Sequence, residues 1–299
     1  MLARGALYAL TNQGEGTMKF KSLLLAAIAL APITAAAENC TQITSLPATI
    51  GAPGKYCLVD SHTVNMTTGN AITIASNDVT LDCDGNTIKN TAVANDGSST
   101  GVYANSRNGI TVENCRIMGG FTNGIDLFQF NSGANANYYS TIRDNQDGGA
   151  YYHGIRAYGS ALEITDNRVY DIGGQAGTYA IGLRVGGSAN AFRLHVVRGN
   201  YIAGTNSPFS AAYGIFSDNS LVSAFLDNGI VGTSAKAGKV AYGMYIKGQH
   251  NRLTDNHIVG TGSPSEVGIH ADDGTTSCYD NYMRVTTETR NCDATLGNY

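Results

Sequence analysis

The amino-acid sequence predicts an all-β protein, a single-domain right-handed parallel β-helix in which about eight coils stack into a solenoid. Two observations lead to this prediction. Glycine is abundant and proline is rare, with 37 Gly and 5 Pro, a composition typical of short strands separated by frequent turns. In addition, one short phrase recurs along the chain: a Gly, an apolar residue, a short strand, and then a position that is almost always Asn.

The recurring phrase defines the coils. It occurs as Gly101-Val102 with Cys115, Gly124-Ile125 with Asn145, Gly154-Ile155 with Asn167, Gly182-Leu183 with Asn200, Gly214-Ile215 with Asn228, Gly243-Met244 with Asn256 and Gly268-Ile269 with Asn281. An opening coil ends at Asn86, and the coil of Asn145 fits less well because Asp147 stands where an apolar residue is expected. The slots at 86, 115, 145, 167, 200, 228, 256 and 281 are 22 to 33 residues apart. Such irregular spacing suits coils whose loops differ in length, stacked as one domain.

Alternation along each strand predicts which side chains point inward. Three columns are expected in the core: one and three residues after each Gly, and three residues before each Asn slot. The first comprises Val102, Ile125, Ile155, Leu183, Ile215, Met244 and Ile269; the second comprises Ala104, Leu127, Ala157, Val185, Ser217, Ile246 and Ala271; the third comprises Cys83, Val112, Ile142, Ile164, Val197, Phe225, Leu253 and Cys278. The Asn residues themselves are expected to stack at a turn, each amide bonding to the next, which is a structural role.

The chain is expected to have four segments. Residues 1–37 form an N-terminal extension and a cleaved signal peptide, because Lys19 and Lys21 precede the apolar run Leu23 to Ala31 and small residues follow it. That run is too short to span a bilayer, where about 20 apolar residues are needed. Residues 38–69 are expected to form an N-terminal cap, 70–290 the β-helix repeats and 291–299 a C-terminal tail. The predicted location is therefore outside the cell or in the periplasm.

Cysteine usage and charge agree with export. All six cysteines follow residue 37, and an even number in an oxidising compartment favours disulfides. We expect Cys40 to pair with Cys57 and Cys278 with Cys292, each closing a terminal segment. The net charge of −4 becomes more negative once residues 1–37 are removed. A mildly acidic protein is poorly suited to nonspecific nucleic-acid binding, which requires basic residues.

The candidate functional residues lie on the outward face of the strand after each Gly. Two residues after Gly stand Tyr103, Asp126, Arg156, Arg184, Phe216, Tyr245 and His270, and four after it stand Asn105, Phe128, Tyr158, Gly186, Asp218, Lys247 and Asp272. Aromatic rings interleaved with charges on a flat sheet are typical of a polysaccharide groove, and the alternative is an ordinary solvated surface. Insertions at Asn131–Ser140, Gly148–His153 and Thr205–Tyr213 are expected to wall one end of this face, and Tyr152 and His153 are further candidates.

Two groups on this face suggest chemistry. Arg156 and Arg184 lie on adjacent coils, where a uronate carboxylate fits between them unless Asp126 already neutralises Arg156. Lys247 is expected between Asp218 and Asp272, which favours its ammonium form, so that it neutralises charge or donates a proton. His270, near Asp272, is then the more reasonable base.

The repeat, the opening stretch Ile50 to Leu58 and the segment Val79 to Ile88 resemble the right-handed parallel β-helix repeat family that includes the pectate-lyase-like proteins. The resemblance covers roughly residues 45–290. Asp272-Asp273 is similar to the paired Asp motif of the pectin hydrolases of this fold, but the accompanying Gly-His-Gly and Arg-Ile-Lys motifs are missing. The Trp-containing and Arg-Pro motifs of the pectate lyases are missing too, so neither set of catalytic residues transfers directly.

The sequence therefore predicts a secreted protein that acts on acidic polysaccharide by β-elimination. The expected catalytic residues are Arg184, Lys247, His270, Asp218 and Asp272, and the expected substrate-binding residues are Tyr103, Asp126, Arg156, Tyr158 and Tyr245. Calcium is a possible helper through Asp218, Asp272 or Asp273, although no loop has a calcium-binding spacing. Two alternatives stay open: a non-catalytic surface solenoid that binds glycan or protein, and an inverting glycoside hydrolase that uses Asp218 and Asp272 about 9.6 Å apart, twice the strand spacing.

Overall fold

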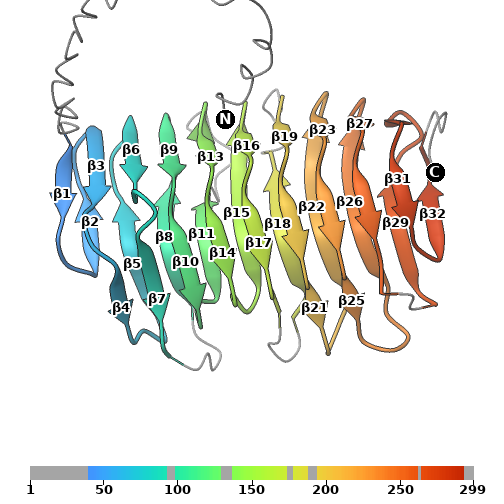
Figure 1. Ribbon diagram of the computed structural model, residues 1–299. Coiled ribbons are helices and arrows are strands. Elements are labelled where there is room, and N and C mark those ends of the chain that lie inside the picture. The colour runs from blue at the N-terminus through green and yellow to red at the C-terminus, as the bar shows by residue number, and fades with distance from the viewer. Residues whose placement is uncertain are drawn as a thin grey trace, which may run out of the picture. The chain divides into compact units, whose positions relative to one another are not determined.

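A computed structural model describes residues 40–92, 98–128, 137–173, 178–187, 194–261 and 264–292, which lie in one compact unit, Asn39–Tyr299. Every regular element in these ranges is a strand, and no helix there is long and apolar enough to cross a membrane. The expected signal peptide at 1–37 and residues 293–299 of the expected tail lie outside the described residues. The strands form a parallel β-solenoid of about eight turns, which confirms the predicted fold (Figure 1).

Three long parallel sheets run the length of the solenoid, and each coil from β3 onward contributes a strand to each sheet. The ten-stranded sheet consists of β1 (Thr41–Ile43), β3 (Gly54–Leu58), β6 (Val79–Asp82), β9 (Ile110–Glu113), β13 (Thr141–Arg143), β16 (Glu163–Thr165), β19 (Val196–Arg198), β23 (Ala224–Leu226), β27 (Arg252–Thr254) and β30 (Ser277–Tyr279). The nine-stranded sheet consists of β4 (His62–Val64), β7 (Thr87–Asn90), β10 (Arg116–Gly119), β14 (Gln146–Gly148), β17 (Arg168–Tyr170), β20 (Tyr201–Ala203), β24 (Gly229–Val231), β28 (His257–Val259) and β31 (Tyr282–Arg284).

The third, eleven-stranded sheet has the longest strands and carries the candidate site. It consists of β2 (Ala48–Ile50), β5 (Gly69–Ile74), β8 (Ser99–Asn105), β11 (Asn123–Phe128), β15 (His153–Ser160), β18 (Ala180–Gly186), β22 (Ala212–Leu221), β26 (Ala241–Gln249), β29 (Glu266–Ala271) and β32 (Thr287–Arg290), with β12 (Asn137–Tyr138) beside β15. A two-stranded sheet, β21 (Asn206–Ser207) with β25 (Ser234–Ala235), joins two loops. Strands β1 to β4, in the range expected for the N-terminal cap, already belong to the three long sheets.

The core is the stack of inward columns that alternation predicts. All members of the three expected columns are almost fully buried, with exposed fractions of 1% or less. The repeat Gly is needed because the chain passes very close to its neighbours: a Cβ on Gly182 would lie 2.4 Å from Cγ2 of Ile202 and 2.8 Å from the carbonyl oxygen of Gly214. A larger residue there would force the coils apart.

One inward position is filled by a carboxyl group. Asp147 pairs in register with Ile117 and Val169, is 1% exposed, and neither of its carboxylate oxygens has a hydrogen-bond partner among the described residues. Burial raises the pKa of Asp147 well above its usual value, because an ionised carboxylate is poorly solvated there. The misfit at this position in the repeat thus reflects a buried acid in the folded protein.

The predicted asparagine ladder is confirmed from Asn145 to Asn281. Along it, each side-chain NH2 donates to the side-chain oxygen of the next Asn, over 2.8 to 3.0 Å, and to a backbone carbonyl of the preceding coil. Asn86 is the exception to the prediction. Cys115 occupies the next slot and offers no amide, and the side chain of Asn86 donates to the carbonyl of Leu58 instead.

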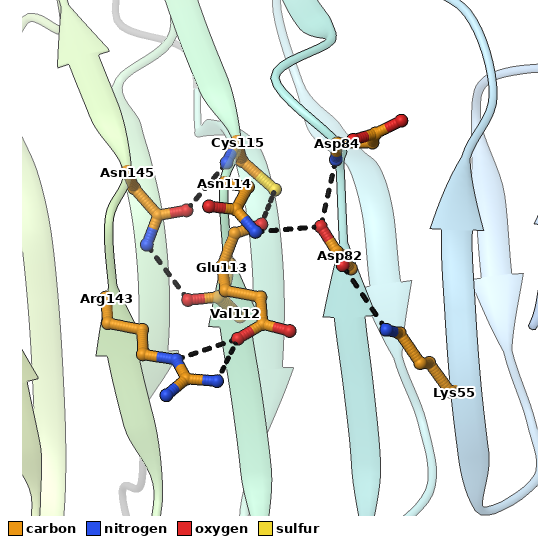
Figure 2. A network of polar contacts seen from close by, with 9 residues as sticks. All are labelled: Lys55, Asp82, Asp84, Val112, Glu113, Asn114, Cys115, Arg143 and Asn145. Carbon is orange, nitrogen blue, oxygen red and sulfur yellow. Dashed lines mark hydrogen bonds and ion pairs between the residues drawn. The ribbon is translucent and has the colours of Figure 1, made fainter. Parts of the chain in front are cut away.

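Three disulfides fasten the solenoid. Cys40–Cys57 and Cys278–Cys292 confirm the two expected terminal pairs, and Cys83–Cys115 links adjacent coils inside the core. Close to the Cys83–Cys115 disulfide, a network of polar contacts links the first coils (Figure 2). Asp82 accepts from Nζ of Lys55 and from the amide of Asn114, and the neighbouring carboxylate of Glu113 accepts from the guanidinium of Arg143. The N-terminal coils are therefore held by covalent and ionic links as well as by packing.

Candidate functional site

The outward face of the eleven-stranded sheet contains a hollow of about 300 Å³ over strands β18, β22 and β26. We call it the aromatic hollow. It is lined by Tyr179, Ile181, Arg184, Tyr213, Phe216, Asp218, Tyr242, Tyr245 and Lys247. Arg184, Asp218, Tyr245 and Lys247 were among the residues expected from the sequence, and the structure brings these four together.

Strand register explains why these side chains meet. Parallel pairing aligns Arg184 with Phe216, Phe216 with Tyr245 and Tyr245 with His270, each on the next strand of the sheet. Toward the N-terminus the same row continues through Arg156, Asp126 and Tyr103. The column two residues after each Gly is therefore one continuous row, but only its middle part borders the hollow.

Arg156 is neutralised by Asp126, the alternative that the sequence left open. Its Nε lies 2.8 Å from Oδ1 of Asp126 and its Nη2 lies 2.5 Å from Oδ2, a two-pronged ion pair. Burial lowers the pKa of Arg156, but the hydrogen bond and the charge of Asp126 together outweigh burial, so the pKa is raised above its usual value. The guanidinium also lies 4.4 Å from the ring centre of Phe128. Arg156, Asp126 and Tyr103 do not line the hollow. The contacts of the Asp126–Arg156 pair are therefore those of a structural ion pair.

Arg184 is held at the edge of the hollow by an ion pair and two rings. Its Nη2 lies 3.2 Å from Oδ2 of Asp218, and its guanidinium lies 5.3 and 5.2 Å from the ring centres of Tyr158 and Phe216. The hydroxyl of Tyr158 donates to the same Oδ2 over 3.2 Å. Both contacts use Oδ2, so Oδ1 of Asp218 accepts no hydrogen bond from the described residues and remains available at the hollow.

Lys247 differs from its expected arrangement. Its Nζ lies 5.7 and 5.6 Å from the ring centres of Phe216 and Tyr245, and it forms no ion pair within 4.0 Å with any described carboxylate. Strand β22 has one extra residue here: between Ser217 and Ser220 the register against β26 shifts by one, so Asp218 and Asn219 together stand against Lys247. The carboxylate of Asp218 pairs with Arg184 instead. The ammonium group of Lys247 therefore lies in the hollow without an ion pair to any carboxylate of the described residues.

Aromatic rings form two stacked columns beside these charges. Tyr213 and Tyr242 are parallel at 5.3 Å, and Phe216, Tyr245 and His270 stack at 5.5 and 4.7 Å. Burial is the main cause that raises the pKa of Tyr213, to about 12, so this phenol stays protonated at neutral pH. The two columns contact each other edge to face, for example Tyr213 with Phe216 at 5.1 Å.

The Tyr213 and Tyr242 column was missed by the sequence analysis. Strict alternation places the residue before each repeat Gly inside the core. At the repeat Gly, however, two successive residues face inward: Gly214 and Ile215 are both buried, and a Cβ on Gly214 would meet the core side chain of Ile230. Tyr213 and Tyr242 therefore share the outer face with Phe216 and Tyr245. The recurrence of Tyr one residue before two successive Gly was the available signal. Tyr213 ends one of the insertions expected to wall the face, whereas residues 131–136 of another lie outside the described part.

His270 and Asp272 form a second cluster beside the hollow. Asp272 Oδ1 accepts a 2.7 Å hydrogen bond from the Tyr245 hydroxyl and lies 3.2 Å from Nε2 of His270, whose Nδ1 is buried without a described partner. Burial and then Asp272 raise the pKa of Tyr245. Neither His270 nor Asp272 lines the hollow. Their contacts fix the Tyr245 ring rather than present a base to it.

The geometry does not favour the two other roles expected of the carboxylates, inverting hydrolysis and calcium binding. Asp218 lines the hollow beside Arg184, whereas Asp272 lies outside the lining and accepts from the Tyr245 hydroxyl, so the two carboxylates do not face a common space as an inverting hydrolase requires. Within the described ranges no group of three or more His, Cys, Asp or Glu is arranged to hold a metal ion. Asp273 accepts from the backbone N–H and hydroxyl of Thr275 in its own turn. These residues do not fit a calcium site.

His153 is buried next to the arginines. Its Nδ1 lies 2.7 Å from Oδ1 of Asn123, its side chain is fully buried, and Nε2 has no partner among the described residues. Burial, and then the charges of Arg156 and Arg184, lower the pKa of His153 well below its usual value, so the ring is neutral. The neighbouring Tyr152 packs against it with ring centres 3.9 Å apart.

No protein-family model matches the chain, and no curated protein matches it. Two solved structures are similar to it. One is a PL6 alginate lyase in complex with a trisaccharide, with a TM-score of 0.40 and 14% identity over 83% of this chain and 55% of that chain. The other is the alginate lyase AlyF-OU02 in complex with G6, with a TM-score of 0.33 and 13% identity over 86% of this chain and 58% of that chain. This chain therefore spans little more than half the length of either protein.

Proposed function

We propose that this protein is a secreted polysaccharide lyase that binds an acidic glycan in the aromatic hollow and cleaves it by β-elimination. The observation that carries the proposal is the ammonium group of Lys247, which lies among aromatic rings beside Arg184 and has no described carboxylate partner. The positive charges of Arg184 and Lys247 attract an anionic uronate, and the faces of its sugar ring suit the surrounding Tyr and Phe side chains. The hollow is therefore complementary to one negatively charged sugar.

The proposed roles use three side chains that line the hollow. The guanidinium of Arg184 receives the uronate carboxylate and so increases the acidity of the adjacent C–H. Asp218, oriented through Oδ2 by Arg184 and Tyr158, takes that proton on Oδ1. The bond from the β-carbon to the glycosidic oxygen then breaks, a C=C bond forms, and Lys247 donates a proton to the leaving oxygen. Afterwards Asp218 returns its proton to Lys247 through solvent, and the site is restored.

His270 and Asp272 act differently in this proposal from the sequence-based expectation. Because the free nitrogen of His270 is buried and Asp272 is engaged by Tyr245, neither contacts substrate. They position the ring of Tyr245, which forms part of the wall. The role of base passes to Asp218, and that of acid to Lys247.

A non-catalytic glycan-binding solenoid is the second candidate function. It is favoured by the ion pairs Asp126–Arg156 and Arg184–Asp218, which already satisfy most charges of the face and leave a surface that can bind without reacting. Both candidates predict binding of acidic glycan, and only the first predicts turnover.

The test mixes the mature protein with a panel of uronic-acid polysaccharides and follows both the absorbance of unsaturated uronate and the appearance of reducing ends. The lyase is supported if absorbance grows with the unmodified protein and with the matched surface variant Lys239→Gln, and does not grow with Asp218→Asn or Lys247→Gln. New reducing ends without a rise in absorbance would show that the protein hydrolyses the glycan and does not cleave it by elimination. Binding without either product would leave the non-catalytic solenoid as the function.

Export is part of the same proposal. The three disulfides support an oxidising compartment, and the order of charged, apolar and small residues before Glu38 supports a cleaved signal peptide. Expression of the full chain in a bacterial host, followed by mass analysis of the exported product, tests this. An intact N-terminus on protein retained in the cytoplasm would contradict it.

A further inference from the structure

A second and larger hollow, of about 1230 Å³, runs along the turn between the ten-stranded and nine-stranded sheets. We call it the turn groove. It crosses successive coils from Asp84 to Tyr201 and shares no lining residue with the aromatic hollow. Nothing in the proposed lyase chemistry uses it, so its side chains need an explanation of their own.

One wall of the turn groove consists of turn residues in the left-handed conformation. Asp84, Asn114, Asp144 and Asp166 have φ between 48° and 57°, and the next coil has Gly199 at the same position. Asp, Asn and Gly tolerate this conformation better than other residues, which accounts for their presence. Backbone preference alone explains the residue types of this wall, so they do not by themselves indicate a ligand.

The opposite wall consists of the first residues of successive strands: Arg116 of β10, Gln146 of β14, Arg168 of β17 and Tyr201 of β20. They are aligned in register, so Arg116 and Tyr201 are about 14 Å apart, three strand spacings. Neither Arg116 nor Arg168 forms an ion pair within 4.0 Å with a carboxylate of the described ranges, although Asp144 and Asp166 line the facing wall. Guanidinium donors and carboxylate acceptors thus line the same groove without forming ion pairs among the described residues.

Tyr201 provides a flat end to this groove. It is 48% exposed, and its ring lies over Gly229 of the next strand, where a Cβ would be 3.1 Å from the ring. The absence of a side chain at Gly229 lets the ring lie against the sheet with one face toward solvent. Exposed aromatic faces of this kind pack against the C–H faces of sugar rings.

We propose that the turn groove binds an uncharged polysaccharide chain that lies parallel to the solenoid axis. Sugar hydroxyls donate to the carboxylates of Asp84, Asp144 and Asp166 and accept from Arg116, Gln146 and Arg168, while one ring stacks on Tyr201. The three carboxylates outnumber the two guanidinium groups, which disfavours a polyanion. The turn groove and the aromatic hollow therefore have opposite charge preferences, and this second site holds the protein on a neutral polymer.

Electrophoresis of the mature protein through gels that contain hydroxyethylcellulose, xylan, glucomannan or polygalacturonate tests the proposal. We expect retardation by at least one uncharged polymer, and a loss of about tenfold in affinity in Tyr201→Ala and in the double variant D144N/D166N. The Asn substitutions preserve the left-handed turn. Asp227→Asn changes the same turn position outside the groove and is the matched control, and thermal unfolding verifies that every variant is folded.

Two results would overturn this proposal. One is the absence of retardation by every uncharged polymer, with or without binding to polygalacturonate. The other is retardation that Tyr201→Ala and D144N/D166N leave unchanged, or that Asp227→Asn reduces equally. The assay does not depend on cleavage, so a protein that fails as a lyase can still pass it.

Discussion

The carboxyl group of Asp147 occupies a place in the solenoid interior where the adjacent coils have Ile117 and Val169. A buried polar group without a hydrogen-bond partner costs about 1–3 kcal/mol of stability. We therefore expect Asp147→Val to raise the free energy of unfolding at neutral pH by about that amount, measured by thermal or chemical unfolding. A loss of stability in this variant would show that the carboxyl group has a partner.

The same residue predicts a pH dependence. Burial raises the pKa of Asp147 in the folded state, so its contribution to stability is complete below the unfolded pKa of about 3.9 and is lost as the pH rises through the folded pKa. Unfolding curves between pH 4 and pH 8 should show this loss in the unmodified protein and not in Asp147→Val or Asp147→Asn. Parallel pH profiles for all three proteins would contradict the assignment.

Arg184 connects binding and chemistry in the aromatic hollow. Its guanidinium orients Asp218 and faces the proposed uronate, so Arg184→Ala should reduce turnover at least a hundredfold, in line with the loss of one preorganised charge-stabilising group. Binding of glycan, measured by titration calorimetry, should persist because the aromatic columns remain. Unchanged turnover and binding would remove the hollow from consideration, and Arg184→Lys tests whether charge alone suffices.

At the scale of one structural element, the asparagine ladder is the feature most sensitive to substitution. Asn228 donates to Asn256 and to the carbonyl of Val197 and accepts from the backbone N–H of Asn200, all in the buried turn. Asn228→Ala leaves these partners unsatisfied and should cost about 1–3 kcal/mol or more of unfolding free energy. Asn105→Ala, at an exposed position, is the control and should change stability by less than about 0.5 kcal/mol. Equal effects would mean that the ladder does not contribute.

Strand pairing and alternation made the elements predictable, because inward columns must be apolar in every coil. The same rule failed at the repeat Gly, because the Gly and the next residue both face inward and leave Tyr213 and Tyr242 on the outer face. It also failed at Asp218, whose carboxylate pairs with Arg184 and not with Lys247, next to the register shift in β22. Both errors are local departures from a strict period of two, and no count of residues along the sequence reveals them.

For the whole molecule, a solenoid contacts itself only between neighbouring coils, so its stability is local. The Cys278–Cys292 disulfide closes a loop with a sequence separation of 14, which is worth about 3 kcal/mol by chain entropy. Hydrogen exchange in C278A/C292A should therefore accelerate in β30 to β32 while β16 to β18 keep their protection. The corresponding variant of Cys40–Cys57 should affect β1 to β3 instead. A uniform increase over the whole chain would show that the solenoid unfolds as one cooperative unit.

The amino-acid sequence by itself determined the solenoid, its core columns and most of its asparagine ladder, because each depends on a pattern repeated in successive coils. It also gave the two terminal disulfides, because each joins two cysteines close in sequence within a terminal segment. It also identified the outward face on which Arg184, Asp218, Tyr245 and Lys247 meet. Only the tertiary structure decided that Arg156 pairs with Asp126, whereas Lys247 has no carboxylate within 4.0 Å in the described part of the chain. The physical reason is that ion pairing depends on differences of a few ångströms between neighbouring coils. Local departures from the strand period, such as the extra residue in β22, set these differences, and the repeat pattern does not encode them.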